Sequence, residues 1–336
     1  MMRKKSWKSQ IFLVFRSTCT TFAVVDALQP NEISHVHGQR CLYVPAKTQQ
    51  SSESPPLLVL IGGMAQSIAA YEPHLPALSR NGRSVLVYEG LGQGPVSNQH
   101  DLTDVSLPAQ AQQLWKVVDS FQESSSLNDE SDSGTETGMI DIAGFSLGGR
   151  VALAAACQSP ERVRKLHLTG VGTDRSARAR VAMQAWKDTV QQDHLGDGPR
   201  SRLRAFAWQV LLTTYNPSFL EQQGQERLEL WIQHICSNNH SAGIRALLDQ
   251  AEVTDQNDNF HVRSMAKRLQ SIDRPTFQGR LCVGELDEMA PVENAKELAE
   301  LLNLESPTIL EGCGHAVTTE APREWRNDVL QFLSDD

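Results

Sequence analysis

Three polar residues in this sequence each follow an apolar segment and could together perform nucleophilic chemistry. Ser146 lies in "DIAGFSLGGR", Asp287 in "VGELDEMAP" and His315 in "GCGHAVTTEAP". A serine hydroxyl is a weak nucleophile that needs a base within hydrogen-bonding reach, and a histidine oriented by a carboxylate supplies that base. We therefore expect Ser146 as the nucleophile, His315 as its base and Asp287 as the orienting acid, with Glu288 as the alternative acid.

Backbone N–H groups near Ser146 could stabilise the negative charge that develops on a carbonyl oxygen. A helical pattern starts at Leu147, so its N–H group is one expected donor. The second donor should come from the turn "IGGMAQS", where Met64 is the candidate by position and Gln66 is the alternative. Gly63 in this turn allows the backbone to approach a substrate closely.

Short apolar segments that alternate with helical patterns should position these groups. The expected strands are residues 57–63, 84–90, 138–144, 163–170, 279–285 and 306–312. The expected helices between and after them include residues 107–121, 147–158, 292–302 and 322–332. This alternation predicts an α/β fold with a mostly parallel sheet flanked by helices, and an antiparallel pair near residues 33–44 at one edge. Ligands of such sheets bind beyond the carboxyl ends of the strands.

Two long segments interrupt the alternation and define the expected domain organisation. Residues 174–273 lack strand signals and read as an inserted helical cap, which leaves residues 30–173 and 274–336 for the core. Residues 124–138, "SSSLNDESDSGTETG", are acidic and free of aromatic side chains, as is typical of a flexible solvated loop. We expect residues 1–29 to be a separate targeting or disordered segment.

The charge distribution bears on localisation and partners. Residues 1–25 carry five basic side chains and no acidic one, whereas the whole chain has a net charge of −9. The basic, Ser/Thr-rich start predicts a transit segment for a chloroplast or mitochondrion, with a secreted or cytoplasmic protein as the alternative. Its apolar run is too short to cross a bilayer, and the acidic body argues against nucleic-acid binding.

Neither a metal nor a cofactor is expected. The histidines His74 and His167 have no companions at metal-ligand spacing, and the six cysteines are scattered without a Cys-x-x-Cys pair. The Ser, His and Asp side chains require no cofactor for acyl transfer. The expected partner is a small-molecule substrate, and the oligomeric state stays open.

Four motifs in this order resemble those of the α/β-hydrolase-fold proteins that carry a helical cap. They are "GGMAQS", "GFSLGG", "VGELDEMAP" and "GCGHAVTTEAP", and they cover the chain from Leu57 to its end. The resemblance implies that Ser146, Asp287 and His315 form a catalytic triad. The sequence departs from the common pattern at two places. It has "GG" where relatives often carry His-Gly, and it has "EGLGQGP" where relatives usually have a stretch that contains arginine.

Residues of the expected cap could select the substrate. Most of its aromatic side chains should form the core of the cap, and one or two, such as Trp208, should face the ligand. The run "PRSRLRAF" contains Arg200, Arg202 and Arg204, and we weigh a solvated helix face against a role of Arg204 in binding an anionic substrate group.

The expected function is a serine hydrolase that cleaves a carboxylic ester or thioester through an acyl-enzyme. One alternative is a carbon–carbon hydrolase or lyase on the same triad, similar to the menaquinone-pathway synthases. The other is a slow, hydrolase-like ligand receptor. The fold itself does not distinguish these, because it hosts many activities.

Overall fold

The computed structural model describes residues 31–46, 55–80, 82–95, 102–126, 138–191, 203–256, 259–272 and 277–334. The expected N-terminal segment, residues 1–29, lies outside these ranges, as does most of the acidic segment 124–138. Residues 124–126, at the start of that segment, form the end of a helix.

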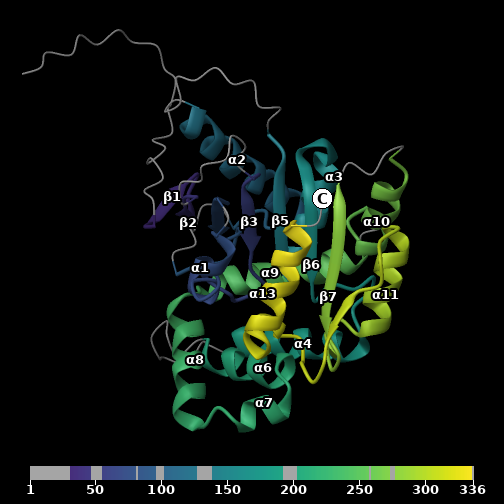
Figure 1. Ribbon diagram of the computed structural model, residues 1–336. Helices are drawn as coiled ribbons and strands as arrows, with labels where there is room; N and C mark the ends of the chain where they lie inside the picture. Colours follow the sequence, from purple (N-terminus) through teal and green to yellow (C-terminus); the bar gives the residue numbers. More distant parts are fainter. Residues whose placement is uncertain are drawn as a thin grey trace, which may run out of the picture.

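One eight-stranded sheet forms the centre of the protein, with the order β1-β2-β4-β3-β5-β6-β7-β8 (Figure 1). The strands are β1 (Ile33–Val36), β2 (Gln39–Val44), β3 (Leu58–Ile61), β4 (Val85–Tyr88), β5 (Ile140–Phe145), β6 (Val163–Thr169), β7 (Gln278–Gly284) and β8 (Thr308–Leu310). The pairings of β2 with β1 and β4 are antiparallel, and the other five pairings are parallel. The predicted α/β class and its mostly parallel sheet are confirmed.

The chain changes direction across the sheet between β3 and β5. Strand β3 pairs with β4 on one side and with β5 on the other, and the strands after β5 continue outward on that second side. In an open parallel sheet, a ligand crevice forms beyond the carboxyl ends of strands at such a switch point. The turns after β3 and β5 carry Met64 and Ser146, so the topology alone brings these residues together.

Helices cover both faces of the sheet, since alternate strand residues point to opposite faces. Val59 and Ile61 of β3 lie in the apolar cluster with α2 (Leu107–Ser126), α3 (Leu147–Gln158), α10 (Val262–Gln270) and α11 (Val292–Leu301). Leu58 and Leu60 lie in a second cluster with α1 (Leu75–Leu78) and α13 (Pro322–Ser334). The short elements η1 (Ile68–Ala70), η2 (Pro160–Arg162) and α12 (Val317–Glu320) complete the core.

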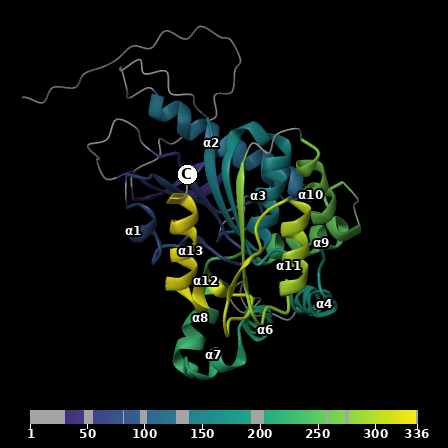
Figure 2. The same cartoon turned by 45° about the vertical axis from the view of Figure 1, so that its right-hand side comes forward.

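Further helices gather mainly beyond one end of the sheet (Figures 1 and 2), and the last of them packs against the first. They are α4 (Ala177–Gln191), α6 (Arg204–Thr214), α7 (Pro217–Glu221), α8 (Gln225–Ser237) and α9 (Ser241–Gln256). Helices α4, α6, α8 and α9 share a separate apolar cluster that includes Trp186, Phe206 and Ile232. We refer to residues 177–256 as the helical layer.

Helix α10 falls within residues 174–273 but does not join the helical layer. Its buried residues Val262, Met265 and Leu269 belong to the cluster around α3 and the sheet. The sequence pattern did not reveal this, because an amphipathic helix shows its apolar face without showing what that face packs against.

Candidate active site

Ser146 occupies a sharp turn between β5 and α3. Its backbone has φ 52° and ψ −112°, which is unfavourable for a side-chain-bearing residue, and its N–H group donates to the carbonyl oxygen of Thr169 at 2.8 Å. Gly148 makes the turn possible, because a Cβ atom there would lie 2.1 Å from the carbonyl oxygen of Ile61. This strand-turn-helix geometry exposes the hydroxyl at the carboxyl edge of the sheet.

The three polar residues expected at the strand ends lie in one line of hydrogen bonds. His315 Nε2 is 2.9 Å from Ser146 Oγ, and His315 Nδ1 is 2.7 Å from Asp287 Oδ2. With Nδ1 protonated, the imidazole donates to Asp287 and accepts the proton of the serine hydroxyl. This arrangement can make a serine oxygen nucleophilic.

The carboxylate of Asp287 is buried and held in place by its own loop. Its second oxygen, Oδ1, accepts from the N–H groups of Met289 at 2.8 Å and Ala290 at 2.7 Å. Glu288, the alternative acid, points elsewhere and pairs with Arg178 at 2.6 Å, with both side chains more than half exposed. The structure therefore brings Asp287 to His315, and not Glu288.

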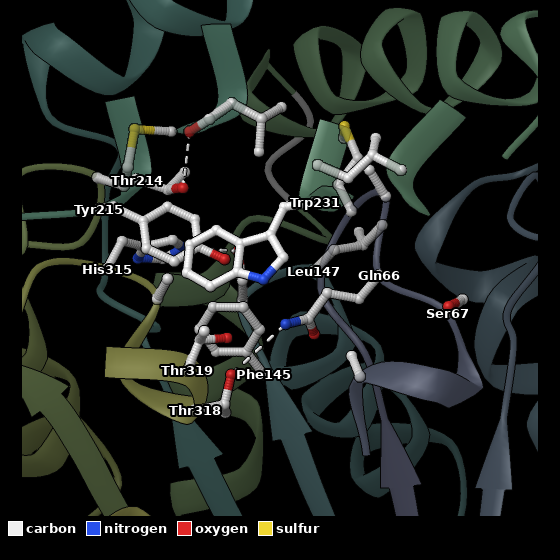
Figure 3. A pocket seen from close by; sticks show the side chains of 18 of the residues that line it. Gln66, Ser67, Phe145, Leu147, Thr214, Tyr215, Trp231, His315, Thr318 and Thr319 are labelled. Atoms are coloured by element: carbon white, nitrogen blue, oxygen red, sulfur yellow. Dashed lines mark hydrogen bonds between the residues drawn. The ribbon is translucent and has the colours of Figure 1, made fainter. Parts of the chain in front are cut away.

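The turn after β3 faces Ser146 and is braced from two sides. Gln66 Oε1 accepts from the N–H group of Gly63 at 2.9 Å, and Gln66 Nε2 is 3.5 Å from the hydroxyl of Thr318 (Figure 3). A Cβ atom on Gly63 would lie 2.8 Å from the ring of Phe145, so this position has room only for glycine. Gln66 thus supports the turn through its side chain, and Met64 lines the cavity beside it.

Two hydrogen bonds join the same turn to the helical layer. Ser67 Oγ is 3.2 Å from His234 Nε2 on α8. Asn239 Nδ2, just after α8, donates to the carbonyl oxygen of Ala65 at 2.9 Å. Ala65 has a positive φ of 65°, so this bond holds a residue that has left the common backbone regions.

A cavity of about 500 Å³ opens over Ser146 and His315 (Figure 3). The sheet edge supplies Ser146, Leu147 and the turn residues 64–67, and the helical layer supplies the opposite wall. The stacked rings of Tyr215 and Trp231, with centroids 5.5 Å apart, form part of that wall. The cavity combines an apolar wall with few polar groups, which is typical of a small-molecule site.

Arg204 and Trp208, the two candidates for substrate contacts from residues 174–273, do not line this cavity. Arg204 pairs with Glu229 at 2.7 Å on the outside of the helical layer, where its side chain is 46% exposed, and its guanidinium lies 5.9 Å from the ring centroid of Trp208. The alternative, a solvated helix face, therefore describes Arg204. Arg200 and Arg202 lie outside the described residues.

The sequence reasoning missed several side chains at this cavity. Arg150 lines it from α3 and Arg175 lines it from the loop after β6. Arg150 stands four residues after Ser146, and that spacing was a usable signal, because such residues share a face of a helix. Glu320, beneath the histidine loop, accepts from the N–H groups of Gly314 at 3.0 Å and Asn216 at 3.2 Å, and no sequence signal marked it.

Burial shifts the pKa of three ionisable groups near the cavity. Burial, helped by nearby Arg175, lowers the pKa of Arg150 to about 9. Burial, helped by Arg326, lowers the pKa of His74 to about 4, so this imidazole is neutral at physiological pH. Burial raises the pKa of the Glu320 carboxyl, against the hydrogen bonds that it accepts from the backbone.

Two kinds of site are not found in the described part of the chain. Those residues contain no group of three or more His, Cys, Asp or Glu side chains arranged to hold a metal ion. Within the same ranges, no helix is both long enough and apolar enough to cross a membrane. His167 is instead buried against Asp328, with Nε2 and Oδ2 2.8 Å apart.

Known proteins resemble this chain in sequence or share its fold. Pyrrolizixenacetamide deacetylase of Xenorhabdus hominickii is 28% identical over 196 residues, which are 58% of this chain and 65% of the deacetylase, so the match spans less than two thirds of that relative. The enol-lactonase of Burkholderia xenovorans LB400 has the same fold, with a TM-score of 0.66 at 16% identity over 90% of this chain and 100% of the lactonase. An esterase of Exiguobacterium antarcticum gives a TM-score of 0.64 at 16% identity, over 91% and 100% of the two chains. The sequence profile of the alpha/beta hydrolase family matches residues 58–328, and this chain belongs to that family.

Proposed function

We propose that this protein is a serine hydrolase that cleaves a carboxylic ester or thioester through an acyl-enzyme. The observation that carries the proposal is the line of hydrogen bonds from Ser146 to His315 and from His315 to Asp287, at 2.9 and 2.7 Å. Ser146 lies at the floor of a cavity on a strained strand-to-helix turn, and an exposed nucleophile requires such a position.

The reaction starts when Ser146 Oγ attacks the substrate carbonyl carbon and His315 Nε2 takes the hydroxyl proton. Asp287 keeps the imidazole in the correct tautomer and stabilises the imidazolium. The carbonyl oxygen becomes negative, and the N–H groups of Met64 and Leu147 are the proposed donors to it. Leu147 is the first residue of α3, where N–H groups lack partners within the helix.

The tetrahedral intermediate then collapses. The bond to the leaving oxygen or sulfur breaks, and His315 returns its proton to that atom. A water molecule next gives a proton to His315 and attacks the acyl carbon. The bond from that carbon to Ser146 Oγ then breaks, His315 returns the proton to Oγ, and the acid is released. The helical layer forms the wall opposite Ser146, so these steps take place within the cavity.

Two observations guide the choice of test substrates. The cavity of about 500 Å³ has a flat aromatic wall at Tyr215 and Trp231, which suits an apolar or aromatic group. The deacetylase to which the chain is similar acts, by its name, on an acetamide, so acetyl amides belong in a substrate panel beside the esters and thioesters.

The test is the Ser146→Ala variant, assayed with p-nitrophenyl acetate and butyrate. We expect turnover to fall by about 10⁴-fold or more, because residues of a nucleophilic triad act as one unit, while the thermal unfolding curve stays that of a folded protein. Labelling of the wild type with a fluorophosphonate should modify Ser146. A variant that keeps its activity would refute the proposal, and turnover of β-diketones or enol acids without ester cleavage would favour a carbon–carbon hydrolase or lyase.

A further inference from the structure

The cavity over Ser146 is basic, although the chain as a whole has a net charge of −9. Three arginines line it, Arg150, Arg175 and Arg227, and the described residues that line it include no Asp or Glu. An acidic protein that presents only positive charge to its ligand space favours an anionic ligand there. The arrangement of the first two arginines shows where that anion would lie.

Arg150 is buried without a hydrogen-bonding partner for its charge. Its residue is 8% exposed, and within the described part of the chain its guanidinium makes no hydrogen bond. Its ion-pair contact there is Asp255 Oδ1 at 3.7 Å, which is too long for a hydrogen bond. A buried guanidinium has five N–H donors to satisfy, so Arg150 retains free donors beside the cavity.

Arg175 approaches the same carboxylate from the loop after β6. Its Nε atom is 2.6 Å from Asp255 Oδ2, so the two guanidinium groups share one acid and keep one positive charge between them. Asp174, the next acid nearby, is engaged by Arg263 and by His261 at 3.2 Å. Neither aspartate lines the cavity, whereas both Arg150 and Arg175 do.

One more donor on the wall lacks an acceptor. The indole N–H of Trp186, on α4, is buried and has no hydrogen-bonding partner among the described residues, and Trp186 lines the cavity. A buried donor that is left unpaired destabilises a protein unless a ligand or water satisfies it. Its nitrogen is itself covered, however, so the donors that are offered to a bound group belong to the arginine pair.

We propose that Arg150 and Arg175 form a subsite for a carboxylate carried by the acyl group of the substrate. Arg150 lies in the first turn of α3, four residues after Ser146, and side chains of an α-helix tilt toward its N-terminus, where Ser146 lies. The N–H group of Arg150 donates to the carbonyl oxygen of Ser146 at 3.2 Å, and both residues line the cavity. The carboxylate then lies a few carbon atoms from the carbonyl that Ser146 attacks, and the substrate class is the monoester or monothioester of a short dicarboxylic acid.

The position of the scissile carbonyl in this inference rests on the proposed function. Binding of an anion by the arginine pair is independent of the proposed function. Arginine suits the task because its planar fork binds a carboxylate through two parallel hydrogen bonds. The competing explanation is that Arg150 and Arg175 only fasten α9, which carries Asp255, to the core. In that case their loss would lower stability and leave substrate selectivity unchanged.

The experiment compares two esters of one acyl length, mono-p-nitrophenyl glutarate and its neutral methyl ester, methyl p-nitrophenyl glutarate. The quantity is the ratio of kcat/KM for the anionic ester to that for the neutral ester. We expect the wild type to favour the anionic ester, and Arg150→Gln and Arg175→Gln each to reduce the ratio by about tenfold to hundredfold, the effect of losing one charge-assisted hydrogen bond. Arg162→Gln is the matched control, since Arg162 pairs with Asp119 at 2.5 Å away from the cavity.

A binding measurement separates this inference from the proposed function. Calorimetric titration of the wild type with glutarate should show binding that weakens about tenfold or more in Arg150→Gln and persists in Arg162→Gln. If neither ester is cleaved but glutarate binding depends on Arg150, the subsite stands and the proposed function fails. If both esters are cleaved at a ratio that Arg150→Gln and Arg175→Gln leave unchanged, and glutarate does not bind, the subsite is overturned and the hydrolase stands.

The subsite can be tested even if one variant fails to fold. Should Arg150→Gln fail to fold, Arg150→Lys keeps the charge but loses the fork, and it should reduce both the ratio and the glutarate affinity. Arg175→Gln, at a less buried position, provides the same test independently. Unchanged ratios in these two variants would overturn the subsite.

Discussion

The carboxylate of Glu320 accepts a hydrogen bond from the backbone N–H of Gly314, the residue before His315, at 3.0 Å. The same oxygen atom accepts from the N–H of Asn216 at 3.2 Å, and the N–H of Ala316 donates to the carbonyl oxygen of Thr214 at 3.0 Å. The loop that carries His315 is therefore tied on both sides to the end of α6. The position of the imidazole depends on the helical layer as well as on Asp287.

Loss of the Glu320 carboxylate should misplace His315 without removing any reacting group. We expect Glu320→Ala to lower kcat for p-nitrophenyl butyrate by about tenfold to hundredfold, the effect of a displacement near 1 Å, with a small change in KM. Glu320→Gln keeps one acceptor oxygen and should restore part of the rate. The control is Glu324→Ala at the exposed start of α13; equal rates for the Glu320 and Glu324 variants would contradict the positioning role.

The aromatic wall should select substrates by their apolar group. Tyr215 and Trp231 line the cavity, and Phe219 stacks on both rings at 6.0 and 6.1 Å from outside it. We expect Trp231→Ala to raise the KM for a phenylacetyl ester about three- to tenfold, because one aromatic contact is lost, and to change the KM for an acetyl ester much less. Phe219→Leu keeps an apolar side chain behind the wall and serves as the control. An equal effect on both esters would show that Trp231 supports the layer and does not contact the acyl group.

His74 should make the folding stability depend on pH. It is buried, with its ring 4.8 Å from that of Trp325, and burial lowers its pKa from 6.5 to about 4. Between these pH values the unfolded chain binds a proton on His74 and the folded protein does not, so stability falls as the pH falls through this window. From pH 7 to pH 5, His74 should account for a loss of about 2 kcal/mol in the free energy of unfolding.

The measurement for His74 is urea unfolding at pH 7 and pH 5 for the wild type and for His74→Gln. The variant should lose less stability on acidification, whatever its stability at pH 7. His35→Gln, at an exposed position on β1, should behave as the wild type does. If His74→Gln loses as much stability as the wild type, His74 is not buried in its neutral form.

Much of the sheet could be predicted because its strands are continuous apolar runs with small or polar residues at their ends. β5 (Ile140–Phe145) overlaps the expected strand 138–144, and α3 coincides with the expected helix 147–158. Helix α12 could not be foreseen, since its four residues are too short to show a period. The sequence also could not show that α10 packs against α3 and the sheet, because its apolar face could equally have packed against the helical layer.

The site residues differ in how much the sequence could say about them. The proximity of Ser146, Asp287 and His315 could be predicted, because each follows a strand and the carboxyl ends of parallel strands share one edge of the sheet. Arg204 was a misleading candidate, because a run of basic residues marks a solvated helix face as readily as a ligand site. Arg150 stood unrecognised in the same motif as Ser146. Which side of α3 faces a cavity depends on the helical layer, and the helical layer is placed by tertiary contacts.

The two hydrogen bonds between the turn after β3 and the helical layer have a consequence for turnover. Ser67 is hydrogen-bonded to His234 on α8, and Ala65 is hydrogen-bonded to Asn239, just after α8. The backbone that presents Met64 to the proposed oxyanion is therefore held by α8 and by Asn239. A displacement of α8 that widened the way to Ser146 would break these bonds and release the turn. Admission of a substrate and readiness to react are then successive states of the same molecule. In that case kcat could not exceed the rate at which α8 returns to its original position.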